Sequence, residues 1–134
     1  MSDESRILAG ILLLSLVSVE SGGLYLLAIA RGKGPATAFQ EKFARAGHAH
    51  AAVLLLLALA IQPYVDATGQ DGFIGWLSRG GVAAAALLMP GGFFFASMGR
   101  GRTTPNRLVV LVPVGAALLA ASLTSLGLGL LTTR

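Results

Sequence analysis

The chain has 134 residues, of which 54% are hydrophobic and 12% are charged, and its formal net charge is +4. The charged fraction is about half of the roughly 25% that is usual in soluble domains. The absence of cysteine excludes disulfides, thiolate metal sites and thiol chemistry. The length fits one domain, 1–134. The basic residues stand in short segments between apolar runs, as membrane topology requires, so we expect no nucleic-acid partner.

Four apolar runs predict four membrane-spanning helices, at about 7–30, 44–61, 80–98 and 108–131. Each run is long enough to cross roughly 30 Å of hydrocarbon as a helix. The first run is longer than the apolar part of a signal peptide and follows mixed charges, so we expect a permanent helix. The sequence therefore predicts an all-α integral membrane protein, a four-helix bundle that crosses the inner (plasma) membrane several times.

The segments beside these runs have their own signals. Residues 37–42 fit the amphipathic first turns of the second helix, and 65–72 fit a polar loop. Residues 73–79 contain Trp76 and predict a turn at the membrane interface. Pro90, followed by two glycines, predicts a kink in the third helix.

The last run contains small residues at every fourth position, which predicts a stripe for close helix packing. These residues are Ala117, Ala121, Ser125 and Gly129.

A carboxylate lies near the middle of the first run, at Glu20, and Gly22 and Gly23 follow it. In hydrocarbon such a group must be protonated, paired or directed to a polar cavity. Glu20 is therefore either a functional residue or a neutral side chain bonded to a neighbouring helix. The two glycines would let another helix or a flat ligand approach closely.

The Lys and Arg residues predict the orientation of the helices. The first and third loops hold seven of the ten: Arg31, Lys33, Lys42, Arg45, Arg100, Arg102 and Arg107. Cytoplasmic loops carry the positive excess. We therefore expect both of these loops in the cytoplasm and both termini on the other side.

The only two histidines, His48 and His50, open the second apolar run. An imidazole is a common ligand for transition metals, and a histidine in hydrocarbon is a functional-site hypothesis by default. Residues two apart point roughly 200° apart on a helix, so both cannot hold one ion. One histidine facing a planar cofactor fits better, and the alternative is a hydrogen-bonded histidine near the headgroups.

Depth along the helices places several candidate residues at similar levels. Glu20 and Pro90 fall near the midplane, and Phe93 and Phe94 fall in the cytoplasmic half with the histidines. We expect a pocket there, lined by one of the histidines, the phenylalanines and Glu20.

Three short motifs resemble the styrene oxide isomerases, which are small four-helix membrane enzymes. Ala44-Arg45-Ala46-Gly47-His48 resembles their Ala-Arg-Ala-His at the start of the second helix. Gly92-Phe93-Phe94 resembles their Gly-Phe-Tyr segment late in the third helix, and Pro105-Asn106-Arg107 resembles the turn after it. The resemblance covers about half of the chain. The helix start is also similar to the haem-ligand helix of haem–copper oxidases.

The resemblance implies a homotrimer that binds haem b between its subunits, with His48 as axial ligand and His50 as second candidate. It implies a Lewis-acid isomerase of small hydrophobic epoxides, with Phe93 beside the cofactor. Three arginines lie on the side where they could pair with the haem propionates, for which arginine is suited: Arg45, Arg100 and Arg102.

The chain departs from the family at two polar positions. The family's active-site tyrosine corresponds to Phe94, and its asparagine beyond the ligand corresponds to Leu54. Glu20 has no counterpart in the family and is the candidate replacement, so Glu20 and Phe94 are the predicted catalytic positions. Two alternatives stay open: a non-catalytic haem protein in sensing or electron transfer, and a small proton-coupled exporter that uses Glu20.

Overall fold

The structure is a computed structural model that describes residues 1–133. Its elements are α1 (Asp3–Ala30), α2 (Ala38–Ala60), α3 (Gln62–Thr68), α4 (Gly72–Ser97), the 3-10 helix η1 (Arg107–Val110) and α5 (Leu111–Thr132). Within the described residues, four segments are long and apolar enough to cross a membrane: Asp3–Ala30, Ala38–Thr68, Gly72–Ser97 and Arg107–Thr132. The predicted all-helical fold with four such helices is confirmed.

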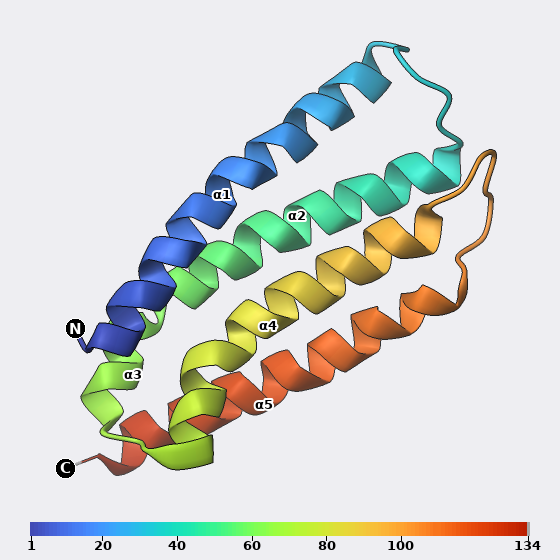
Figure 1. Cartoon of the computed structure of the whole chain (residues 1–134). Helices are drawn as coiled ribbons and strands as arrows, with labels where there is room; N and C mark the ends of the chain where they lie inside the picture. Colours follow the sequence, from blue (N-terminus) through green and yellow to red (C-terminus); the bar gives the residue numbers. More distant parts are fainter. Residues whose placement is uncertain (134) are drawn as a thin grey trace.

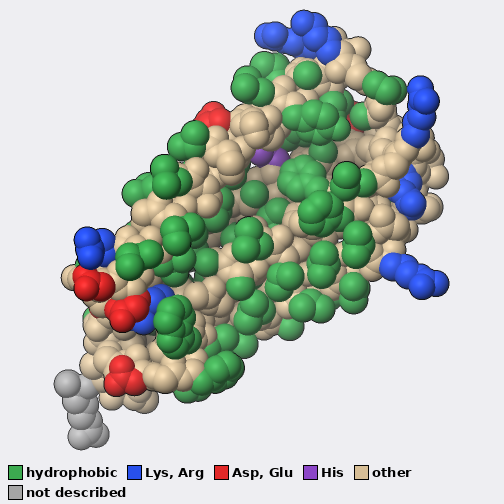
Figure 2. Space-filling model, in the orientation of Figure 1, with side chains coloured by type: hydrophobic (Ala, Val, Ile, Leu, Met, Phe, Trp, Pro, Cys, Tyr) green, Lys and Arg blue, Asp and Glu red, His purple; other side chains and the backbone are tan. Residues whose placement is uncertain are grey.

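The long helices pack side by side in chain order (Figure 1). Helix α1 packs against α2 and the short α3, α2 packs against α4, and α4 packs against α5. Both termini lie at one end, and the loops after α1 and α4 lie at the other. Most Lys and Arg side chains gather at the loop end, whereas most Asp and Glu side chains lie toward the termini (Figure 2).

The second helix begins earlier than its apolar run because a capping box starts it. The side chain of Thr37 accepts a hydrogen bond from the backbone N–H of Gln40, and the side chain of Gln40 accepts one from the backbone N–H of Thr37. Together these bonds satisfy two backbone donors that a helix start leaves free. Helix α2 therefore starts at Ala38, and residues 37–42 form its cap and first turns, as expected.

The predicted polar loop and interfacial turn are mostly helical. Residues Gln62–Thr68 form α3. Pro63 stands in the first turn of this helix, where proline is tolerated because its missing N–H would have no partner within the helix. Helix α4 already begins at Gly72, so the turn expected at 73–79 is wrong. Side chains in this region find partners inside the protein: Gln62, for example, donates to the carbonyl oxygens of Ala58 (2.7 Å) and Arg79 (3.2 Å).

Helices α4 and α5 approach closely through small residues, some of which lie outside the predicted stripe. A Cβ added to Gly92 would lie 2.7 Å from Val112, and one added to Gly115 would lie 2.5 Å from Met89. Ala117 and Ala121 of the predicted stripe are exposed. Its other two members, Ser125 and Gly129, contact Ser78 or Gln70 near the start of α4. Helix α4 continues without interruption through Pro90.

A polar cluster fastens the start of α1 to α3 and α4. One carboxylate oxygen of Asp66 accepts hydrogen bonds from the hydroxyls of Ser2 and Ser5 (2.8 Å each) and pairs with Arg79 at 3.1 Å. The other accepts from the backbone N–H of Ser2 at 2.7 Å. Nε of Arg79 also donates to the Ser5 hydroxyl at 3.1 Å. The side chains of Arg79 and Asp66 are only 13% and 17% exposed, so few other partners could replace these bonds.

We expect Asp66→Ala to lower the free energy of unfolding by about 3 kcal/mol, because it leaves Arg79 and two serines without their shared partner. Thermal unfolding in detergent, followed by circular dichroism, measures the change. Asp3→Asn is the matched control: Asp3 pairs with Arg6 in an exposed bridge, and such bridges contribute at most about 1 kcal/mol. Equal losses in the two variants would contradict the assigned role of Asp66.

Candidate functional site

A cleft opens between α1, α2 and α4 toward the loop end of the molecule. It consists of two adjoining cavities of about 490 and 280 Å³. Both are lined by Ser21, Gly22 and Phe94, so we treat them as one site and call it the α1–α2–α4 cleft. Cavities of this size are typical of small-molecule sites. Figure 2 shows histidine atoms in a hollow between helices on this side of the molecule.

The imidazole of His48 lies against the two glycines of α1. A Cβ added to Gly22 would stand 2.9 Å from Nδ1 of His48, and one added to Gly23 would stand 3.7 Å from its Nε2. The glycine pair therefore makes room for this ring. His48 also lines the smaller cavity of the cleft. Neither ring nitrogen of His48 has a hydrogen-bond partner among residues 1–133.

His50 lies on another face of α2, as the two-residue spacing predicts. Its Nδ1 is 2.7 Å from the carbonyl oxygen of Ala46. Because a carbonyl only accepts hydrogen bonds, Nδ1 is the donor in this contact. The ring lies 5.0 Å from that of Phe93, centroid to centroid, and lines a separate cavity of about 200 Å³ with Val53. The histidines thus have different surroundings.

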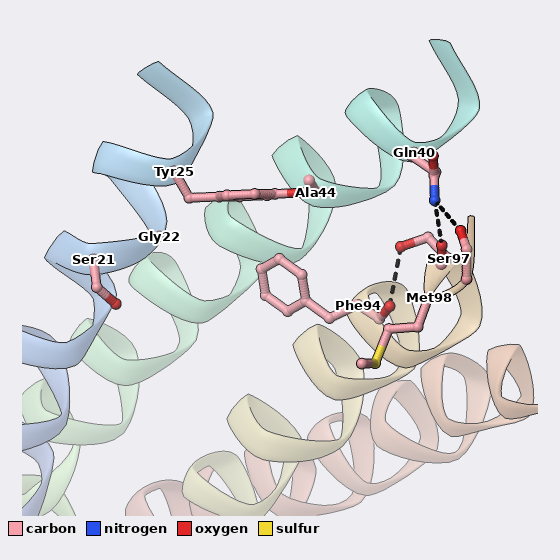
Figure 3. A pocket seen from close by; sticks show the side chains of 9 residues that line it. Ser21, Gly22, Tyr25, Gln40, Ala44, Phe94, Ser97 and Met98 are labelled. Carbon is pink, nitrogen blue, oxygen red and sulfur yellow. Dashed lines mark hydrogen bonds between the residues drawn. The ribbon is translucent and has the colours of Figure 1, made fainter. Parts of the chain in front are cut away.

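Phe93 and Phe94, late in α4, lie in different surroundings. Phe93 belongs to an aromatic cluster, with its ring centroid 5.5 Å from that of Phe43. Phe94 packs on Gly47, where an added Cβ would lie 3.0 Å from its ring, and it also lines the cleft. Figure 3 shows the Phe94 ring pointing into the space between α1, α2 and α4. Of the two, Phe94 forms a wall of the cleft beside His48.

The charged candidates lie outside the cleft. Glu20 is exposed on α1 and lines neither of its cavities. Arg45 is exposed and pairs with Glu41 at 2.6 Å. Nε of Arg102 donates to the carbonyl oxygen of Met98 at 2.9 Å, and Arg100 is exposed in the same loop. The structure therefore brings together His48 and Phe94, but not Glu20 or the three arginines.

Tyr25 is a cleft residue that the sequence analysis missed. Its ring reaches from α1 across the larger cavity toward Ala44 (Figure 3), and the side chain is 55% exposed. Its hydroxyl has no hydrogen-bond partner among residues 1–133. The sequence carried a weak signal, because Ser21 and Tyr25 are four residues apart and share a helix face. Tyr25 gives the cleft a phenol, which Phe94 does not provide.

At the loop end of the cleft, hydrogen bonds join the first turn of α2 to the end of α4. Nε2 of Gln40 donates to the carbonyl oxygens of Ser97 (3.0 Å) and Gly99 (2.7 Å), as the dashed lines in Figure 3 mark. The hydroxyl of Thr37 donates to the carbonyl oxygen of Arg102. These bonds hold the first turn of α2 against the loop that follows α4.

His48 is a residue of the cleft that could serve as an axial ligand of a haem. Among residues 1–133, no group of three or more His, Asp or Glu side chains could hold a metal ion. A haem iron needs less from the protein, because the porphyrin supplies four ligands and one histidine completes the proximal side. His48 offers an unpartnered ring nitrogen next to an apolar wall made by Phe94.

Comparisons of this chain with protein-family models, with curated proteins and with solved structures found no match. The likeness to the styrene oxide isomerases therefore stays a prediction from the three short motifs.

We expect Gly22→Leu to displace the His48 ring, because the new side chain would occupy the space in which that ring lies. Overpacking of this kind lowers the free energy of unfolding by about 1–3 kcal/mol. Gly10→Leu is the matched control on the same helix, since a Cβ there meets nothing within 4 Å. Thermal unfolding of the two variants in detergent measures the difference. Equal stability of the two variants would contradict close packing of the His48 ring on Gly22.

Proposed function

We propose that the chain is an integral plasma-membrane protein that crosses the bilayer four times. The four long apolar helices support this, as does the separation of charges between the two ends of the molecule. Cytoplasmic loops are enriched in Lys and Arg. In this proposal the loops after α1 and α4 face the cytoplasm, and both termini face the opposite side.

We further propose that the protein binds haem b through His48 in the α1–α2–α4 cleft. The observation that carries this proposal is a histidine without a hydrogen-bond partner, placed beside a cleft with an apolar wall. When bound, ferric haem would supply a Lewis acid that polarises an oxygen atom of the substrate. The proposed activity, from the resemblance, is isomerisation of a small hydrophobic epoxide.

The chain's own residues would bind and orient such a substrate. Phe94 offers an apolar surface for its hydrocarbon part, and the glycine pair of α1 keeps His48 in place. The Tyr25 hydroxyl can donate a hydrogen bond to a substrate oxygen, which Phe94 cannot do. Tyr25 would thereby provide the polar contact that the family's tyrosine provides from the Phe94 position.

The proposed homotrimer gives Glu20 a role that the single chain does not. Because Glu20 is exposed on an apolar helix, it would face lipid in an isolated subunit, which is costly for a carboxylate. Contact with a neighbouring copy would cover it. A catalytic role for Glu20 therefore depends on a site completed between subunits.

We expect the detergent-purified protein to show a Soret band at near-stoichiometric occupancy. His48→Ala should lose most of this absorbance, because the axial ligand is removed, whereas His50→Ala should keep it. The oxidised spectrum also separates two functions, since a filled sixth position would favour a sensing or electron-transfer protein. A spectrum that stays empty after reconstitution with haemin would refute haem binding, and loss of haem only in His50→Ala would reverse the ligand assignment.

We expect cysteine labelling to confirm the orientation, because the chain has no cysteine of its own. Arg100→Cys should react with a membrane-impermeant maleimide only after the cells are opened. Asp71→Cys, an exposed position toward the other end of the molecule, should react in intact cells. The opposite pattern would reverse the proposed topology.

A further inference from the structure

A second groove lies between α1 and α4 near the termini, away from the α1–α2–α4 cleft. Its cavity measures about 320 Å³. Its apolar part includes Ile7 and Ile11 of α1 and Ala83 of α4, and its other lining residues include Glu4, Trp76 and Arg79. The groove thus combines an apolar floor with one acidic and one basic side chain.

Glu4 and Arg79 both keep polar atoms that have no hydrogen-bond partner among the described residues. Glu4 is exposed and forms no salt bridge within residues 1–133, whereas its neighbour Asp3 pairs with Arg6 at 2.9 Å. Arg79 uses Nε for Ser5 and Nη2 for Asp66. No described residue accepts a hydrogen bond from its Nη1. The groove is therefore lined by an exposed carboxylate, by an arginine whose Nη1 has no partner among the described residues, and by apolar side chains.

We propose that this groove binds a phospholipid with an ethanolamine headgroup. The ammonium group of the lipid donates to Glu4, its phosphate accepts from Nη1 of Arg79, and an acyl chain lies along Ile7 and Ile11. Such charge-assisted bonds are stronger than neutral ones. Trp76, which is 63% exposed, stands where tryptophan usually meets the headgroup region. The inference rests on the proposed membrane insertion but not on haem.

The chemistry of the two charged groups selects among the common headgroups. Choline carries the same charge as ethanolamine but has no N–H to donate to Glu4. Glycerol headgroups carry no cation, so a phosphatidylglycerol would bring net negative charge beside a carboxylate. The ethanolamine headgroup is the one of these three that satisfies both Glu4 and Arg79.

The test uses Trp76, which is the only tryptophan of the chain and lines the groove. The protein is reconstituted into bilayers that contain small fractions of lipids with brominated acyl chains, which quench nearby tryptophan fluorescence. Phosphatidylethanolamine, phosphatidylcholine and phosphatidylglycerol with identical chains are compared. We expect the ethanolamine lipid to bind about two- to fivefold more tightly than the choline lipid, which is the effect of one additional, partly exposed hydrogen bond.

Two variants assign this preference to Glu4. Glu4→Gln should bring the ethanolamine and choline lipids to equal quenching, and Asp3→Asn, the matched control, should keep the preference. Equal quenching by all three lipids in the native protein, or an unchanged preference in Glu4→Gln, would overturn the site. Absence of quenching by any brominated lipid would overturn it together with the proposed membrane insertion.

Discussion

The contact between the His48 ring and the backbone of Gly22 and Gly23 determines how α1 sits on α2. Without side chains on the two glycines, the imidazole can lie directly on the first helix. The same region of α2 presents Gly47 to Phe94, so α4 also comes close. The cleft lies beside these two contacts, on the side of Ser21 and Tyr25.

At the other end of the molecule, polar bonds join the start of α1 to α3 and α4. Between helices in lipid the hydrophobic effect gives little drive for association, so close packing and hydrogen bonds specify which faces meet. The Asp66 cluster joins three helices through side chains that have few other partners. Helix α1 is thus held near its start by the Asp66 cluster. Farther along, it is held by the close packing of His48 on Gly22 and Gly23.

The sequence predicted the parts of the fold that depend on local composition. Uncharged runs located the four long helices, and the two-residue spacing placed His48 and His50 on different faces of α2. The ends of the helices were harder to predict from the sequence. The first turns of α4, for example, have partners such as Ser125 that are distant in sequence. Two members of the small-residue stripe of α5, Ser125 and Gly129, contact Ser78 or Gln70, whereas the other two are exposed, because periodicity does not reveal which face meets α4.

The sequence predicted only those residues of the candidate site whose type is unusual in a membrane helix or belongs to a motif. His48 stands out because histidine is rare in an apolar run, and Phe94 because it belongs to a motif. Tyr25 gave little signal, since an aromatic residue in a membrane helix is common. Whether it lines a cleft depends on the distance between α1 and α4, which no local pattern encodes.

The bonds of Gln40 have a consequence for how the molecule could move. One amide side chain caps its own helix and also grips two carbonyl groups beyond α4. The first turn of α2 and the loop after α4 therefore act as a single rigid clasp. Helix α1 makes none of these bonds, and its start is fixed by the Asp66 cluster. Widening of the cleft would therefore come from movement of the later turns of α1, with the loop between α1 and α2 absorbing the change.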